Sequence, residues 1–336
     1  MDSLKNLVCK IFHPEKQFAV TDKKDSTPSF SHFQTSTRTE QQNLPSVNHK
    51  YAGFDLEIAK IIDGGFSEWR SQRPLGISCA ALYTLGHSPE IWYGRDSDGK
   101  PALRIDRSLA IKLVHSLLNR VENGFKIVTW NGLGFDFDVL AEESKMWEEC
   151  RFLGLEHIDI MFHILCIKGY PIKLDKAAKG MGLAGKIAGV TGDKAPELWQ
   201  KGSYETVLEY VAQDSRTTVE VASMINNYGY LDWTSNSGKP QNVYFPDGLL
   251  TVREAMKLPL PDTSWMQDPM SREQFLDWTF HKSNIYIIPD GIPRNSIYPD
   301  IEGSESDIVL NTEDSLIDKI NAILSEAESF DKGLEN

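Results

Sequence analysis

The fold of this chain is decided by residues 51–61, YAGFDLEIAKI, which are predicted to form a β-strand with two acids on one face. Side chains two positions apart in a strand point to the same face, so Asp55 and Glu57 are expected side by side, with Phe54, Leu56 and Ile58 facing the other way. Two such carboxylates repel each other unless cations lie between them. An Asp-x-Glu pair is also a frequent accident on a solvent-facing strand, so this pair needs support from the rest of the chain.

The surrounding sequence alternates strand and helix patterns. The strand that starts at Tyr51 extends toward residue 61, and further strands are predicted over 76–85, 90–94 and 126–130, the first three as an antiparallel meander. Apolar spacing predicts helices over 106–122, 135–147, 203–225, 271–281 and 312–330. This order predicts an α/β domain with a mixed sheet covered by helices on both faces, although periodicity alone leaves several α/β folds open.

Changes in composition divide the chain into four segments. Residues 1–48 are predicted to be a polar leader, and residues 49–228 the main domain. Residues 229–300 form an aromatic and proline-rich, irregular extension that we expect to pack on the core. Residues 301–336 hold an acidic amphipathic helix and tail, which either docks on the domain or serves as the docking segment for a protein partner.

Composition excludes several classes of protein. The chain is 40% hydrophobic and 25% charged, as globular proteins are, and no apolar stretch is long enough to cross a bilayer. The N-terminus lacks the apolar segment and cleavage site of a secretory signal, so we expect a cytoplasmic protein with no membrane contact. The four cysteines show no pairing or zinc-ligand spacing, which predicts reduced thiols: Cys9, Cys79, Cys150 and Cys166.

The net charge of −13 argues against a nucleic-acid partner, but the uneven distribution of the charges weakens this argument. Residues 300–336 carry eleven acids against two lysines, so the rest of the chain has a net charge of only −4. Residues 168–201 contain seven lysines against three acids, a local charge of +4. This lysine-rich insert is either a contact for a phosphate backbone or an ordinary solvated surface.

Two further motifs carry acids. Residues 131–136, NGLGFD, are predicted to turn from a strand into a helix that starts near Asp136, where an acid can also be a simple cap and Asp138 could share its role. Residues 210–214, YVAQD, place Tyr210 and Asp214 four apart, on the same face of a helix. A buried tyrosine near an aspartate is often only a hydrogen-bonded core pair, so neither motif is decisive alone.

In this order, the three motifs resemble the Exo I, Exo II and Exo III motifs of the DEDD family of 3′–5′ exonucleases. Tyr210 points to the tyrosine-containing branch, because the histidine of the other branch would stand at Glu209. The resemblance covers roughly residues 50–228 and implies a ribonuclease H-like fold, a mixed five-stranded sheet with helices on both faces. Residues 173–186 and 157–161 are similar, more weakly, to exonuclease domains of family B polymerases, where Asp159 would be structural.

The resemblance implies two Mg²⁺ or Mn²⁺ ions bound by Asp55, Glu57, Asp136 and Asp214. Asp55, Glu57 and Asp214 would hold the ion that activates water, Asp55 would bridge to the second ion near Asp136, and Tyr210 would orient or deprotonate the water. Candidates for binding the nucleic-acid 3′ end are Leu56, Ile58, Trp130, Asn131 and Phe135. Many relatives have a threonine where this chain has Ile58, so recognition of the terminal sugar is expected to differ.

The sequence therefore predicts a 3′–5′ exonuclease that releases nucleoside 5′-monophosphates, with single-stranded DNA the favoured substrate. A structure-selective endonuclease on the same fold and a catalytically silent nucleic-acid-binding module stay open as alternatives. Preference for DNA or RNA and for single or double strands, the pathway and the oligomeric state are not encoded in these motifs.

Overall fold

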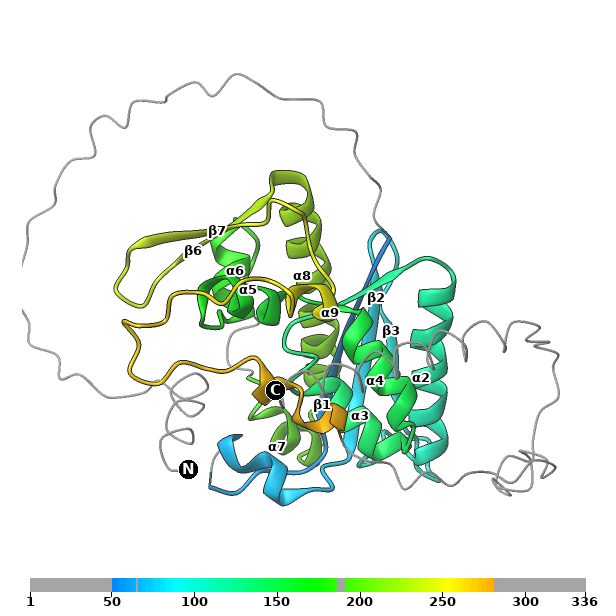
Figure 1. Ribbon diagram of the computed structural model, residues 1–336. Helices are drawn as coiled ribbons and strands as arrows, with labels where there is room; N and C mark the ends of the chain where they lie inside the picture. The colour runs from blue at the N-terminus through cyan, green and yellow to red at the C-terminus, as the bar shows by residue number, and fades with distance from the viewer. Residues whose placement is uncertain (1–49, 65, 186–190, 281–336) are drawn as a thin grey trace, which may run out of the picture.

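The computed structural model describes residues 50–64, 66–185 and 191–280 (Figure 1). The predicted leader, residues 1–48, and the acidic segment, residues 301–336 with its predicted helix over 312–330, lie outside the described residues. No helix among the described residues is both long and apolar enough to cross a membrane.

A mixed five-stranded sheet forms the centre of the domain. Its strands are β1 (Tyr51–Ile58), β2 (Ile77–Thr84), β3 (Glu90–Tyr93), β4 (Lys126–Thr129) and β5 (Ile158–Asp159), in the spatial order β3-β2-β1-β4-β5. β2 pairs antiparallel with β1 and β3, whereas β4 pairs parallel with β1 and β5. The carboxyl ends of β1 and β4 therefore meet at one edge of the sheet, where a site can form.

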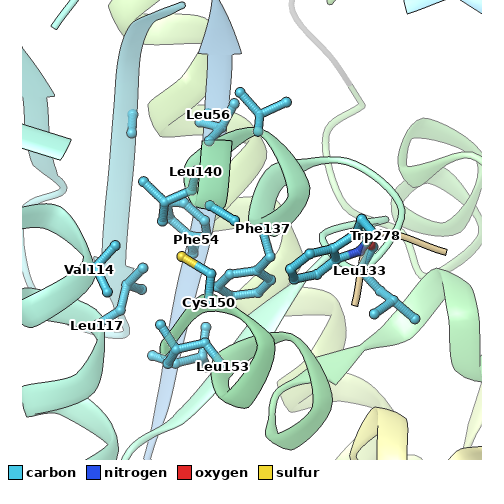
Figure 2. Close-up of a cluster of buried hydrophobic side chains, with 14 of the residues drawn as sticks. Phe54, Leu56, Val114, Leu117, Leu133, Phe137, Leu140, Cys150, Leu153 and Trp278 are labelled. Atoms are coloured by element: carbon cyan, nitrogen blue, oxygen red, sulfur yellow. The ribbon is translucent and has the colours of Figure 1, made fainter. Parts of the chain in front are cut away.

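Helices cover both faces of the sheet, as the sequence predicts. On one face, α2 (Arg107–Glu122), α3 (Asp136–Ser144) and α4 (Trp147–Glu156) bury a cluster that includes Phe54, Leu56 and Phe137 (Figure 2). On the other face lie α6 (Leu174–Gly180), α7 (Ala195–Gln200) and the long α8 (Tyr204–Tyr228). α5 (Ile160–Lys168) follows β5 directly and contributes buried side chains to both clusters.

The contact between β1 and α8 is unusually close because residue 53 is glycine. A Cβ atom at Gly53 would clash with the carbonyl oxygen of Ser215 and would lie 2.7 Å from Cγ2 of Val219. A glycine inside a strand often marks such a backbone approach. The sequence therefore lets α8 lie directly on the strand that carries Asp55 and Glu57.

The chain after α8 is more regular than the sequence predicted. Residues 230–244 form an antiparallel hairpin of β6 (Tyr230–Thr234) and β7 (Pro240–Tyr244), followed by α9 (Val252–Ala255). A Cβ atom at Gly180 would clash with the backbone at Asp232, so the hairpin lies directly against the end of α6.

Two predicted helices were wrong in extent. The helix expected over residues 135–147 is two helices, because Lys145 adopts a left-handed conformation with φ of 63° that ends α3 before α4 begins. The helix expected over 271–281 consists of two short 3₁₀ turns, Glu273–Phe275 and Asp277–Phe280. Their side chains point to different partners on the domain, and those tertiary contacts replace a single amphipathic face.

Replacing Gly53 by alanine should lower the free energy of unfolding by about 1–3 kcal/mol, because the new methyl group meets the backbone of α8. Urea denaturation of the purified protein measures this loss. Adding Val219→Ala should not rescue the variant, because the Ser215 carbonyl is backbone and stays in place. Full rescue by the second change would show that only the valine methyl sets the distance between α8 and β1.

Candidate active site

The acids of the first two motifs meet where β1 runs past the end of β4. Pairing between these strands is recorded as far as Gly53 and Val128, and three residues later the backbone N–H of Leu56 donates to Oδ1 of Asp136 at 3.0 Å. A buried N–H needs an acceptor, and the Asp136 carboxylate replaces the missing strand. Asp136, the first residue of α3, is thereby fixed beside the backbone between Asp55 and Glu57.

The acid face of β1 is the face that α8 covers. Glu57 lies opposite Cys79 and Asp55 opposite Ala81, and both of these β2 residues pack in the cluster that holds Val207 and Val211 of α8. Burial, followed by the negative charge of Glu57, raises the pKa of the Cys79 thiol well above its usual value. The predicted alternation along β1 is confirmed, because Phe54, Leu56 and Ile58 belong to the core on the opposite face.

α8 adds Tyr210 and Asp214 to the same group of charges. Burial raises the pKa of the Tyr210 phenol well above 10, and the charges of Asp214, Glu57 and Asp55 and a hydrogen bond with Asp214 raise it further. Tyr210 is 2% exposed and Asp214 is 6% exposed. The fold thus brings all five predicted catalytic residues into one neighbourhood.

The donor set of this neighbourhood suits divalent cations. Burial raises the pKa of the Asp136 carboxyl well above its usual range, and the negative charges of Asp159 and Asp214 add to this effect. A buried cluster of acids is costly without compensating positive charge, and hard cations such as Mg²⁺ prefer oxygen ligands. Among the described residues, no group of three or more His, Cys, Asp or Glu side chains is arranged to hold a metal ion as it stands.

The β4–α3 loop, residues 130–135, is held by the carboxylate of Asp159. Oδ1 of Asp159 accepts from the backbone N–H groups of Asn131 and Phe162 at 3.0 Å, and Oδ2 accepts from that of Leu133 at 3.0 Å. Burial raises the pKa of this carboxyl to about 6, although the backbone donors lower it. The arrangement agrees with a structural role for Asp159, because its oxygens are engaged by backbone.

A series of uncharged groups linked by hydrogen bonds also holds the β4–α3 loop. The Gly132 N–H donates to Oγ1 of Thr129 at 3.0 Å, and that hydroxyl lies 2.9 Å from Nε2 of His157. Nδ1 of His157 lies 2.9 Å from the carbonyl oxygen of Gly154, which assigns the proton to Nδ1 and leaves Nε2 to accept from Thr129. Burial lowers the pKa of His157 to about 3, so the ring stays neutral at physiological pH.

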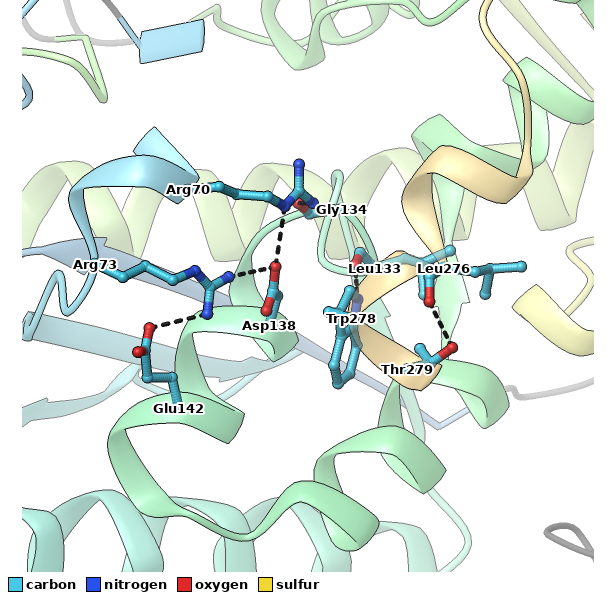
Figure 3. A network of polar contacts seen from close by, with 9 residues as sticks. All are labelled: Arg70, Arg73, Leu133, Gly134, Asp138, Glu142, Leu276, Trp278 and Thr279. Atoms are coloured by element: carbon cyan, nitrogen blue, oxygen red, sulfur yellow. Dashed lines mark hydrogen bonds and ion pairs between the residues drawn. The ribbon is translucent and has the colours of Figure 1, made fainter. Parts of the chain in front are cut away.

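The extension after α9 also contacts the β4–α3 loop. Nε1 of Trp278 donates to the carbonyl oxygen of Leu133 at 2.6 Å (Figure 3), and the indole packs so closely on Gly154 that a Cβ there would lie 2.9 Å from it. A Cβ at Gly134 would lie 2.8 Å from the Phe275 ring. Arg272 anchors this segment, because its guanidinium donates to four backbone carbonyls, those of Cys166, Met256, Leu258 and Pro259.

The predicted substrate-binding residues fall into two groups. Leu56 and Ile58 are 3% and 1% exposed, so their side chains belong to the core and only their backbone borders the site. The others lie in the β4–α3 loop. Trp130 donates from Nε1 to the carbonyl oxygen of Ile172 at 2.9 Å, Asn131 has a φ of 76°, and Phe135 lies at the start of α3 with its ring centroid 5.0 Å from that of Trp69.

Sequence reasoning missed the segment between β1 and β2. Arg73 forms ion pairs with Asp138 at 2.5 Å and Glu142 at 2.9 Å, and Arg70 lies 3.4 Å from Asp138 and donates to the carbonyl oxygen of Gly134 at 3.2 Å (Figure 3). Asp138 thus faces these arginines, although burial still raises its pKa. No spacing in the sequence signals these contacts, since Arg70 and Gly134 are 64 positions apart.

The lysine-rich insert also reaches this region. A Cβ atom at Gly192 would lie 4.0 Å from the hydroxyl oxygen of Tyr210, and Nε2 of Gln200 donates to the carbonyl oxygen of Ala59 just beyond β1 at 3.0 Å. The described part of the insert therefore passes beside the acid cluster. Its lysines on α6 are engaged in local contacts, such as that of Lys179 with Asp175 at 2.8 Å.

The sheet order and the position of the acids define a ribonuclease H-like α/β domain. Residues 101–226 match the model of the RNase H superfamily, a range that includes Asp136, Tyr210 and Asp214 but begins after β1. This match covers less than half of the chain, and it supports a nuclease-type activity at the level of that superfamily.

Among solved structures, the chain is similar to the family B DNA polymerase from the hyperthermophilic archaeon Pyrobaculum calidifontis. The sequences are 20% identical and the TM-score is 0.39, with 53% of this chain and 24% of the polymerase chain covered. The chain thus spans about a quarter of the length of that polymerase. No match was found among curated proteins.

Trp278→Phe should loosen the β4–α3 loop, because phenylalanine keeps an aromatic ring but loses the N–H that the Leu133 carbonyl accepts. We expect a loss of about 1–3 kcal/mol in the free energy of unfolding and faster hydrogen exchange of the loop amides. Trp265→Phe is the matched control, since Trp265 also donates to a backbone carbonyl but is 69% exposed. Equal effects of the two variants would contradict a specific anchor.

The buried neutral His157 should make stability depend on pH. Its pKa is about 3 in the folded protein and near 6.5 in the unfolded chain, so the unfolded chain gains the proton first as the pH falls. The stability of the parent relative to His157→Gln should therefore be constant above about pH 6.5 and should fall as the pH drops toward 3, because glutamine does not titrate. Urea denaturation of the parent and His157→Gln across this range measures the difference, and a constant difference would show that His157 does not titrate in this window.

Proposed function

We propose that this chain is a metal-dependent 3′–5′ exonuclease of the tyrosine-containing DEDD type. It would hydrolyse phosphodiester bonds of DNA or RNA from the 3′ end, with single-stranded DNA favoured, and release nucleoside 5′-monophosphates. The observation that supports this most is the hydrogen bond from Leu56 to Asp136, because it joins the first and second motifs at the strand that α8 covers with Tyr210 and Asp214.

The cofactors of this reaction would be two Mg²⁺ or Mn²⁺ ions held by Asp55, Glu57, Asp136 and Asp214. Two such ions, when bound, stabilise negative charge on the attacking and leaving oxygens of a phosphodiester. The protein's part is to hold its carboxylates in place. β1 places Asp55 and Glu57, and the hydrogen bond from the Leu56 N–H holds Asp136. The close contact at Gly53 sets the distance between β1 and α8, the helix that carries Asp214.

Tyr210 is better suited to orient the attacking water than to deprotonate it. Its raised pKa keeps the phenol protonated at neutral pH, so the hydroxyl can donate to one partner and accept from another. The hydrogen bond with Asp214 fixes the direction of the phenol. Removing the hydroxyl should then cost less than removing a carboxylate.

The proposal predicts a graded loss of activity on 5′-labelled single-stranded DNA and RNA of matched sequence. Asp55→Asn and Asp214→Asn should lower kcat by roughly a thousandfold or more, because each removes a charged oxygen ligand. Tyr210→Phe should lower kcat by roughly ten- to a hundredfold and leave the pKa values of the pH–rate profile unchanged, because the phenol stays protonated and is not the base. Glu90→Gln, at the far edge of the sheet, is the control and should match the parent.

The products discriminate between the candidate functions. A ladder shortened from the 3′ end supports the exonuclease, whereas internal cuts in circular DNA would favour a structure-selective endonuclease. Calcium-supported binding with no cleavage in Mg²⁺ or Mn²⁺ would favour a catalytically silent binding module. In either of the last two cases the exonuclease assignment is wrong.

A further inference from the structure

The site described above is rich in negative charge, and a nucleic-acid strand brings more. Its five acids, Asp55, Glu57, Asp136, Asp159 and Asp214, lie within a chain whose net charge is −13. Affinity for a phosphate backbone comes from cations that contact individual phosphates. A cation beside the site, outside the expected ion-binding acids, would supply such a contact.

Arg70 is a cation that lies beside the site. It lies in the 3₁₀ segment Phe66–Gln72, which follows β1, and its Nη2 donates to the Gly134 carbonyl at 3.2 Å. Gly134 precedes Phe135 in the chain and is two positions from Asp136. The Trp69 ring, next to Arg70 in sequence, contacts the Phe135 ring edge-on at 5.0 Å. The guanidinium thus lies against the β4–α3 loop.

The guanidinium is also held in a fixed orientation. Its central carbon lies 4.4 Å from the centroid of the Trp69 ring, and its Nε lies 3.4 Å from Oδ2 of the buried Asp138. A guanidinium carries five N–H donors in one plane, and these two polar contacts use Nε and Nη2. Figure 3 shows the remaining nitrogen pointing away from Gly134 and Asp138. An arginine that is already ordered loses less entropy when it binds a phosphate.

Arg73 stacks on the same tryptophan but has a different role. Its guanidinium carbon lies 4.9 Å from the Trp69 ring, and its two terminal nitrogens pair with Asp138 and Glu142. The side chain of Arg73 is 20% exposed, whereas that of Arg70 is 46% exposed. Arg73 therefore pairs with two acids of α3, and Arg70, which also contacts Asp138, is the more exposed arginine of the pair.

We propose that Arg70 binds a backbone phosphate of the nucleic-acid strand, outside the ion-binding acids, and so fixes the strand on the β4–α3 loop. This proposal rests on the proposed nuclease function but deepens it with a phosphate subsite that the three motifs do not contain. Arg70 contacts the strand and not the reacting atoms, so it contributes to binding in the ground state and the transition state alike.

Binding of a fluorescein-labelled oligothymidine to the full chain in Ca²⁺, measured by anisotropy at several salt concentrations, tests the subsite. Loss of one phosphate contact should reduce the slope of log K against log salt by about 0.7 for a single strand. Arg70→Ala should show this smaller slope and a roughly tenfold weaker Kd. Arg70→Lys should keep the slope, since it keeps the charge, but lose part of the affinity.

Arg95→Ala is the matched control, because Arg95 also stacks on a ring, that of Tyr93 at 4.9 Å, but lies beyond β3 at the far edge of the sheet. It should leave the slope and the Kd unchanged. A merely structural role of Arg70 would lower the melting temperature without changing the salt slope. In Mg²⁺, Arg70→Ala should raise KM roughly tenfold and leave kcat near the parent value.

An unchanged slope in Arg70→Ala, an equal change in Arg95→Ala, or no binding by the parent would overturn the phosphate subsite. A failure of the proposed exonuclease activity gives a different result from a failure of the phosphate subsite. If the parent binds with an Arg70-dependent slope but does not cleave in Mg²⁺ or Mn²⁺, the subsite stands and the chain is a binding module. If the parent cleaves but Arg70→Ala changes neither slope nor KM, only the subsite is wrong.

Discussion

The close contact between β1 and α8 at Gly53 is the constraint on which the site depends. A side chain at this position would meet the backbone of Ser215, so only glycine lets the helix approach this near. Asp214 immediately precedes Ser215, and Asp55 lies two residues after Gly53. One backbone contact in the core therefore sets the distance between acids that come from opposite ends of the domain. The packing of α8 on β1 therefore also sets the geometry of the site, because moving the helix outward would separate the carboxylates.

The β4–α3 loop shows how the fold holds an acid in an unfavourable place. Asp159 and Thr129 accept the N–H groups of the loop, and Trp278 and Arg70 donate to its carbonyls. These N–H and carbonyl groups of the loop therefore all have hydrogen-bond partners, and the start of the helix that begins with Asp136 is held in place. The hydrogen bond from the Leu56 N–H offsets part of the cost of burying the Asp136 carboxylate. The hydrogen bond from Trp278 makes residues 271–280 part of the domain, although they follow the segment that matches the RNase H superfamily.

Charge is arranged in two layers around this loop. The inner layer consists of buried groups whose pKa is raised first by burial and further by neighbouring negative charges, as the Asp136 carboxyl and the Tyr210 phenol show. The outer layer consists of the arginines that stack on Trp69, of which Arg73 pairs with two acids of α3 and Arg70 stays half-exposed. Such an arrangement lets a chain with a net charge of −13 present positive charge at one place, where field strength depends on local distance and not on the total.

The sequence by itself determined the strands β1 to β4, the faces of β1 and the five candidate catalytic residues, because these rest on periods of two and four and on three short motifs. It also predicted the mixed five-stranded sheet, but it missed the break at Lys145 and the hairpin of residues 230–244. Only the tertiary structure decided that Leu56 joins Asp136, that Trp278 closes on Leu133 and that Arg70 reaches Gly134. These pairs are 80, 145 and 64 positions apart, and a single hydrogen bond over such a separation leaves no pattern in the sequence, because its geometry exists only after the chain has folded.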